Sequence, residues 1–141
     1  NNYCRMTRIL TSYYACRHLP DNAFLVQVSA TKPKGFIADF TWTDVMPDYM
    51  SLVRLHKAGL LDNTQYAEQY TAKLDAALSQ ISLMLHRIKI LAGERDIVLL
   101  CWCRPSAFCH RHILAHWLNK HFDVHIAEWQ PKSNYCTISL F

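Results

Sequence analysis

Apolar runs bounded by turn-forming residues predict a series of short strands along the chain. Residues 97–103 (IVLLCWC) are apolar without interruption, which is typical of a strand that is buried on both faces of a parallel sheet. Shorter strand-like runs occupy 8–13, 24–30 and 124–129, and the breaker run TKPKG follows the second of these. Residues 135–141 (YCTISLF) are typical of a terminal edge strand or of a strand that pairs with another chain.

Helices are predicted where apolar residues recur at spacings of three and four. Such residues run from Leu74 to Leu91 and predict one long helix over about 63–91, with Gly93 as its stop. The segment before this helix has a mixed pattern of aromatic, apolar and turn-forming residues. We expect it to form a loop with one short helix around 48–58.

A final helix is predicted after the long apolar run. Ser106 is the expected N-cap of this helix, which covers about 107–121. Strands and helices that alternate in this order indicate an α/β fold, a three-layer sandwich around a small, mostly parallel sheet. The 141 residues fit a single domain over 1–141 without internal repeats, and residues 1–7 are expected to be flexible or foreign to the natural chain.

Composition narrows the class of protein. Hydrophobic residues make up 51% of the chain and charged residues 18%, which is typical of a globular protein and not of a disordered one. The net charge of +4 is compatible with an anionic ligand but is too small to demand nucleic acid as the partner. Three glycines are too few for a glycine-rich phosphate loop.

The sequence also predicts where the protein works. No apolar run approaches the roughly 18 residues of a membrane span, so we expect no membrane segment. The first residues, NNYCRMTR, contain no apolar signal core. Because nothing indicates secretion, the six cysteines are expected to be reduced and the protein to be cytoplasmic.

Residues 101–117 (CWCRPSAFCHRHILAHW) concentrate the residue types that carry chemistry: three of the six cysteines, two arginines and three of the eight histidines. In an α/β sheet, ligands bind beyond the carboxyl ends of the strands, where the helices begin. The backbone N–H groups and positive dipole of a helix start favour an anion, and Arg104 and Arg111 could bind one as well. A cysteine in this setting is a candidate nucleophile, which makes Cys109 the residue of greatest interest.

Packing is the alternative for each cysteine of this segment. Cys101 and Cys103 share one face of the strand and are typical small core residues, and Cys109 could equally pack under the helix. The spacing excludes two familiar thiol sites. A phosphatase loop needs arginine six positions after its cysteine, where Cys109 follows Cys103, and no Cys-x-x-Cys redox motif is present.

Metal binding is a second alternative. We predict no cofactor, but a zinc or iron ion could be held by a cluster of four residues, which are Cys101, Cys103, Cys109 and His110. The spacing of this set matches no standard zinc motif. His112 and His116 lie four apart on one helix face, which is a known metal geometry but is more common for solvated histidines.

These motifs resemble a known family. The segment DIVLLCWCRPSAFCHRHILAHWL is similar to the signature of domain-of-unknown-function family 488 (DUF 488), in which an apolar strand and a cysteine precede a short turn and Cys-His-Arg opens a helix. The segments ILTSYYA, VQVSATKPKGF and MPDYMSLVRLHKAGLLDNTQYAEQY resemble a short branch that is often encoded by phages or prophages. The resemblance covers about 8–129 and implies an α/β sandwich with Cys109, His110 and Arg111 at its ligand-facing end. It implies no reaction, so the function is argued from the site.

The predicted site combines three segments of the chain. The ends of the first two strands are expected on the same side of the sheet as the turn 103–111. The residues predicted to bind a ligand there are Ser12, Tyr13, Lys34, Arg104, Ser106 and Arg111. Their hydroxyl, ammonium and guanidinium groups suit a phosphate or carboxylate. Cys109 and His110 are the predicted catalytic residues, as nucleophile and as acid or base.

Two functions from different classes are compatible with these residues. The first is an enzyme or sensor that binds a small anionic ligand of nucleotide or nucleoside type and catalyses a transfer or hydrolysis on it. The second is a non-catalytic phage protein whose basic turn and exposed aromatic side chains contact nucleic acid or a host protein. Only the first needs a thiol at a helix start, so the behaviour of Cys109 separates the two.

Overall fold

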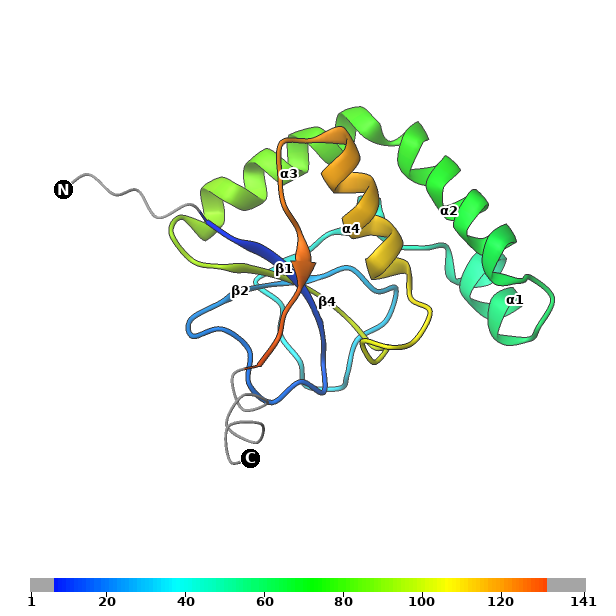
Figure 1. Ribbon diagram of the computed structural model, residues 1–141, viewed down its shortest axis with the longest axis horizontal. Coiled ribbons are helices and arrows are strands. Elements are labelled where there is room, and N and C mark those ends of the chain that lie inside the picture. Colours follow the sequence, from blue (N-terminus) through cyan, green and yellow to red (C-terminus); the bar gives the residue numbers. More distant parts are fainter. Residues whose placement is uncertain (1–6, 132–141) are drawn as a thin grey trace, which may run out of the picture.

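The sheet of the computed structural model consists of five strands that all run parallel (Figure 1), and the structure describes residues 7–131. The strands are β1 (Ile9–Tyr13), β2 (Phe24–Gln27), β3 (Phe40–Thr41), β4 (Ile97–Cys101) and β5 (Ala127–Glu128), in the spatial order β3-β2-β4-β1-β5. The predicted α/β fold around a parallel sheet is confirmed. The strand expected over 135–141, and all but Thr7 of the expected flexible segment 1–7, lie outside the described residues.

β4 is the central strand because each of its residues is buried and it pairs with β1 on one side and β2 on the other. The uninterrupted apolar run therefore reflects burial of this strand on both faces, as predicted. The pairing with β1 begins at Ile9 opposite Ile97 and ends at Tyr13 opposite Cys101. Since the strands are parallel, β1, β2 and β4 all end at one edge of the sheet, and the turn after Cys101 lies at that edge.

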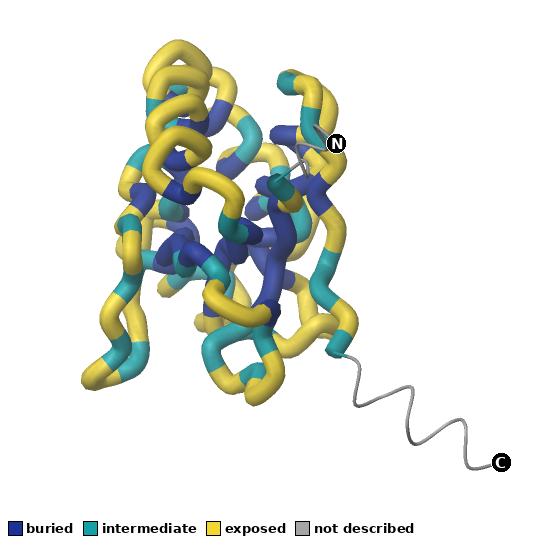
Figure 2. The backbone as a smooth tube through the Cα atoms, turned by 90° about the vertical axis from the view of Figure 1, so that its left-hand side faces the viewer, coloured by how far each residue is buried: buried dark blue, intermediate teal, exposed yellow. Residues whose placement is uncertain are grey.

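Helices cover one face of the sheet, as Figure 1 shows. The helical segments of the described chain are the 3-10 helix η1 (Thr43–Val45), the π-helix η2 (Tyr49–Val53), α1 (Arg54–Lys57), α2 (Asn63–Ala76), α3 (Leu78–Ala92) and α4 (His110–His121). The short helix expected around 48–58 corresponds to η2 and α1. The main core lies between the sheet and α2, α3 and α4, and the buried positions run through the middle of the molecule in Figure 2.

The opposite face of the sheet is covered by loops. Leu10, Val98 and Leu100 form a smaller buried cluster there, and Phe36 from the loop before β3 and Trp129 from the segment after β5 pack against it. The connections between the first three strands contain Pro20, Pro33 and Gly35 within short segments, which leaves no room for a helix. The outer layer on this side of the sandwich is therefore made of loop residues.

The long helix predicted over 63–91 is two helices, and this prediction is corrected. Ala77, with φ −104° and ψ 13°, separates α2 from α3. The apolar periodicity could not reveal the break because Leu74 and Ile81 are seven residues apart, which keeps both on the same face of a continuous helix. The bend allows α2 to pack against α4 while α3 continues along η1 and the sheet. Gly93 ends α3 with φ 61°, as expected.

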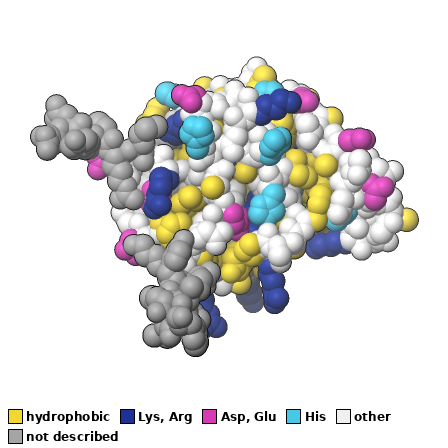
Figure 3. Space-filling view, in the orientation of Figure 1, with side chains coloured by type: hydrophobic (Ala, Val, Ile, Leu, Met, Phe, Trp, Pro, Cys, Tyr) yellow, Lys and Arg dark blue, Asp and Glu magenta, His cyan; other side chains and the backbone are white. Residues whose placement is uncertain are grey.

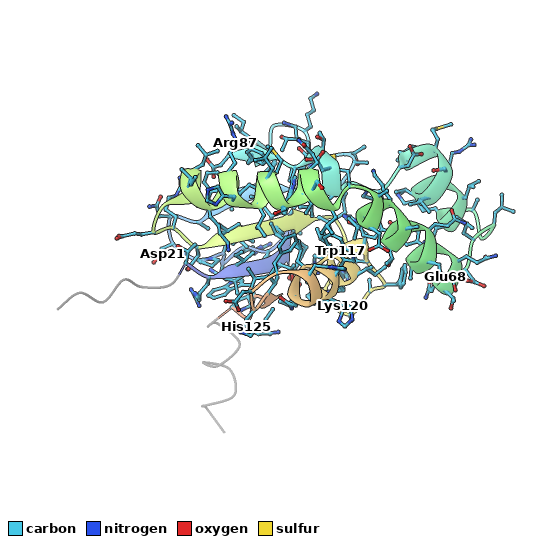
Figure 4. All side chains as sticks on the ribbon, turned by 90° about the horizontal axis from the view of Figure 1, so that it is seen from above. Asp21, Glu68, Arg87, Trp117, Lys120 and His125 are labelled. Atoms are coloured by element: carbon cyan, nitrogen blue, oxygen red, sulfur yellow. The ribbon has the colours of Figure 1, made fainter. Side chains whose placement is uncertain are left out.

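Side chains of α4 tie this helix to its neighbours. Leu114 and Leu118 are fully buried against the sheet, and the Trp117 Nε1–H donates to Asp75 Oδ1 of α2 at 2.9 Å. Figure 4 shows Trp117 where α4 meets α2 and α3, whereas Lys120 extends from the same helix to its exposed side. Among residues 7–131, no helix combines the length and the hydropathy that crossing a bilayer requires.

Shortening Leu114 should strongly destabilise the fold. Because the side chain is fully buried, Leu114→Ala removes apolar contacts and leaves a cavity, and we expect a loss of about 2–5 kcal/mol in the free energy of unfolding. Urea unfolding followed by circular dichroism measures this loss. The matched control is Leu83→Ala on α3, where the side chain is 58% exposed and the change should be within about 0.5 kcal/mol. Similar losses for both variants would contradict the described core.

Candidate functional site

The turn between β4 and α4 forms the centre of the candidate site. β4 ends at Cys101, and α4 begins at His110 with Cys109 as its N-cap. The Cys109 backbone is extended, with φ −150° and ψ 141°, and its side chain does not cap the helix. The first backbone N–H groups of α4 and the positive end of its dipole therefore lie beside the Cys109 sulfur.

Ser106 is not the N-cap of this helix, and the predicted start at 107 is wrong. The chain instead makes a turn in which the Ala107 N–H donates to the Arg104 carbonyl at 3.0 Å. The residues of this turn are exposed. The backbone of Cys109 is extended, so the helix cannot start before this residue. The Cys109 sulfur contacts Cys101 at the end of β4.

Three thiols meet at this point. The sulfur atoms of Cys101, Cys103 and Cys109 lie within 4.8 Å of one another, and the Cys101 and Cys109 Sγ atoms are 2.8 Å apart. Cys101 and Cys109 are buried, with 1% and 4% of their surfaces exposed, whereas Cys103 is half-buried. The sequence analysis considered a packing role and a functional role for each cysteine separately. In the structure the three cysteines form a single cluster.

The pKa values of Cys101 and Cys103 are both raised. The hydrogen bond with Cys103 lowers the pKa of Cys101, but the hydrogen bond with Cys109 and burial outweigh it and raise the pKa to about 11. The hydrogen bond with Cys101, followed by burial, raises the pKa of Cys103. Both thiols keep their protons at neutral pH, so Cys101 can donate its S–H to the Cys109 sulfur.

Arg111 is the cation beneath these thiols. It is fully buried and forms a two-pronged ion pair, in which Nε donates to Glu128 Oε1 at 3.0 Å and Nη2 donates to Glu128 Oε2 at 2.9 Å. Its Nη1 faces the cluster, 3.0 Å from Cys101 Sγ and 3.6 Å from Cys109 Sγ, and also donates to the Cys103 carbonyl. Burial lowers the pKa of Arg111, but the hydrogen bond to Glu128 and the nearby thiols raise it by a larger amount. The guanidinium therefore stays charged.

His110 is held as a neutral imidazole. Its Nε2 lies 2.9 Å from the Val28 carbonyl, which can only accept, so Nε2 carries the hydrogen and Nδ1 keeps a lone pair. Nδ1 faces Cys109 Sγ at 3.9 Å. Burial, together with the charge of Arg111, outweighs the opposing effect of the hydrogen bond to Val28 and lowers the pKa of His110 to about 4. His110 can therefore accept a proton from Cys109, but it holds none to give at neutral pH.

A pocket of about 490 Å³ opens beside the thiols. Cys101, Cys103, Cys109 and His110 form one part of its wall. Another part of the wall consists of aromatic and basic residues from η2, α1, α2 and the turn, which are Tyr49, His56, Lys57, Tyr66, Trp102 and Phe108. Three of these rings pack on one another, with the centroid of His56 5.1 Å from that of Phe108 and 5.0 Å from that of Tyr66.

None of the six predicted ligand-binding residues lines this pocket. The N–H groups of Arg111 are occupied by Glu128 and the cluster, and direct binding of a ligand by this guanidinium stays a prediction. Ser12 is fully buried away from the pocket, and no other group of the described residues bonds its hydroxyl. Tyr13 lies against the Arg111 guanidinium at 5.9 Å. Lys34 is exposed and outside the pocket wall.

Arg104 and Ser106 remain exposed in the turn, close to the pocket in sequence but not part of its wall. Sequence reasoning missed Lys57, His56 and Phe108. Phe108 immediately precedes Cys109, so its place near the candidate site could have been predicted from the sequence. Lys57 and His56 belong to the short helix expected around 48–58, but no pattern in the sequence places that helix at the same pocket as the end of β4.

The buried neutral imidazole predicts a loss of stability in acid. Between pH 6.5 and about 4, the unfolded chain protonates at His110 and the folded chain does not, so the free energy of unfolding falls as the pH is lowered through this range. We expect wild type to lose about 3 kcal/mol more than His110→Gln over this range, as measured by urea unfolding at both pH values. His125→Gln, at an exposed position, should behave as wild type does. An equal pH dependence in wild type and His110→Gln would contradict this description of His110.

Comparison with known proteins identifies the family. A family model described as the active DUF488-N3 subclade matches residues 4–122, which includes β1 to β4, the turn and the whole of α4. Among curated proteins and solved structures, nothing matches. The matched region carries the Cys109-His110-Arg111 sequence that suggested the resemblance. The chain belongs to the domain-of-unknown-function family 488.

Proposed function

We propose that the protein is an enzyme that binds a small ligand with a planar ring and an anionic group, of nucleotide or nucleoside type, and attacks it with Cys109. The observation that carries this proposal is the setting of the Cys109 sulfur. It lies at the N-terminus of α4, faces the pocket, and is approached by Arg111 Nη1 at 3.6 Å and by His110 Nδ1 at 3.9 Å.

The chemistry follows from these neighbours. The Arg111 guanidinium and the Cys101 S–H stabilise negative charge on the Cys109 sulfur. His110 Nδ1 accepts the thiol proton as the sulfur attacks an electrophilic carbon or phosphorus of the ligand, and a covalent bond to Cys109 forms. Because a protonated His110 is acidic in this buried position, it passes the proton to the departing group. Water or an acceptor molecule then displaces the group from Cys109.

Ligand binding is assigned to the aromatic and basic part of the wall. Phe108, Tyr66 and His56 offer ring faces and edges for a planar base. Burial raises the pKa of Tyr66, so its phenol stays neutral. Lys57 and the N-terminus of α4 supply positive charge for an anionic group. The family description as an active subclade supports catalysis rather than binding alone.

The binding alternative receives less support. A nucleic-acid surface needs a continuous basic area. On the face shown in Figure 3, lysine and arginine side chains are scattered and alternate with acidic ones. A non-catalytic phage protein also has no use for a thiol held between a guanidinium and an imidazole. This alternative is kept as an outcome of the binding experiment.

Ligand binding is tested with the four common ribonucleosides and their 5′-monophosphates in a thermal-shift assay. At least one monophosphate should raise the Tm more than its nucleoside, because Lys57 and the α4 N-terminus favour the phosphate. Phe108→Ala should weaken this binding roughly tenfold through lost ring contacts. Ile37→Ala, at an 84% exposed residue outside the pocket, should not. No shift with any compound, together with salt-sensitive binding of a DNA duplex, would favour the binding alternative.

The reactivity of Cys109 is tested with iodoacetamide. We expect it to alkylate Cys109 roughly ten times faster than the half-buried Cys16, since the groups around Cys109 stabilise the attacking thiolate. Peptide mass spectrometry at several reaction times measures both rates. Arg111→Lys keeps a positive charge but cannot reproduce the bonds to Glu128 and the thiols, and should slow the labelling of Cys109 alone. Equal rates for Cys109 and Cys16 in wild type would argue against an activated nucleophile.

A further inference from the structure

The reaction proposed above uses the contact between Cys101 and Cys109 only to stabilise charge. Their sulfur atoms are 2.8 Å apart although no bond joins them, and the two residues come from different elements, the end of β4 and the N-cap of α4. A disulfide has a sulfur–sulfur distance of about 2.0 Å. The two thiols could therefore join after a movement of less than an ångström, without any rearrangement of the sheet or the helix.

The charges around the cluster favour a pair of thiols over a metal site. Arg111 Nη1 donates to Cys101 Sγ at 3.0 Å, which puts a fixed positive charge where a cation would have to bind. Two cysteine sulfurs on one zinc ion are about 3.8 Å apart in tetrahedral geometry. The observed 2.8 Å is much shorter, and it suits sulfur atoms that share a proton or form a bond with each other.

The pocket gives a small molecule access to both thiols. Cys101, Cys103 and Cys109 all line it. Cys109 is the thiol with the activating neighbours, and Cys101 is its nearest thiol. Cys103 is the most exposed of the three, and its thiol interacts with both Cys101 and Cys109.

We propose that Cys101 is the resolving thiol of Cys109, and that the two close into a reversible disulfide when a low-molecular-weight disulfide such as oxidised glutathione enters the pocket. Cys109 attacks one sulfur of that disulfide, forms a mixed disulfide and releases one thiol. Cys101 then attacks the Cys109 sulfur and releases the second thiol. Two protein thiols are oxidised, one external disulfide is reduced to two thiols, and the protons of Cys101 and Cys109 leave with these products.

The consequence for activity rests on the proposed function. The disulfide removes the nucleophile that the reaction needs, and a thiol reductant restores it. Because Cys109 is captured by a neighbour that is nearly in contact, it is also protected from further oxidation to sulfinic or sulfonic acid. The site then works only in a reducing environment.

The test treats the full-length, reduced protein with oxidised glutathione, blocks the remaining thiols with N-ethylmaleimide and analyses the peptides by mass spectrometry. Wild type should show a Cys101–Cys109 cross-link without bound glutathione. Cys101→Ser should instead keep one glutathione on Cys109, because the resolving thiol is missing. Cys103→Ser is the matched control and should form the cross-link as wild type does. Dithiothreitol should reverse both products.

Three results would overturn the proposal. They are a lasting glutathione adduct on wild-type Cys109, a cross-link that requires Cys103, and a stoichiometric metal ion whose removal is needed before any thiol reacts. This experiment uses no substrate, so it is independent of nucleotide binding. Formation of the cross-link without nucleotide binding would refute the proposed function alone, and nucleotide binding without the cross-link would refute this inference alone.

Discussion

The buried ion pair between Arg111 and Glu128 is the constraint on which the rest of the site depends. A guanidinium with no exposed surface is strongly unfavourable unless its charge and N–H groups are matched, and Glu128 does both with two hydrogen bonds. Thr11 donates to the same carboxylate at 2.6 Å, so the pair connects α4 to β5 and to β1. The N–H groups left over can only point toward the end of β4. Loss of either partner would leave a buried charge uncompensated, at a cost of about 3–5 kcal/mol.

This constraint explains why the cysteines are a cluster and not three separate core residues. Arg111 Nη1 bonds the Cys101 sulfur and the Cys103 carbonyl, which holds the end of β4 against the first turn of α4. Cys109 packs its sulfur against Cys101, and its backbone takes the extended conformation that delays the helix start. The site and the local fold are products of one network, so a change to the network alters thiol reactivity and stability together.

The sequence was most informative where a local pattern has one physical cause. The apolar run of β4 predicted a central strand because a strand buried on both faces requires apolar residues. Gly93 predicted a helix stop because a positive φ favours glycine. Periodicity could not show the bend at Ala77, since the apolar face stays in phase across it. It also could not show the pairing of Arg111 with Glu128. Arg111 was read as a ligand-binding group because an arginine at a helix start serves an anion or a buried carboxylate equally well, and only the fold decides between them.

The geometry of a helix start also gives a reason for Cys-His-Arg as consecutive residues. Cys109 is the extended N-cap, and the helical side chains of His110 and Arg111 project about 100° apart around the axis, so the three neighbours at the start of α4 face different environments. Cys109 faces the pocket, His110 reaches the Val28 carbonyl beside β2 and packs its ring edge-on against Tyr70 of α2, and Arg111 enters the sheet toward β5. Cys109 presents its sulfur to the pocket, while the contacts of His110 and Arg111 fix the orientation of the helix start. Moving any of the three by one position would exchange these environments, placing a charge in the apolar contact or a thiol against Glu128, which is why the order of the three residues matters as much as their identity.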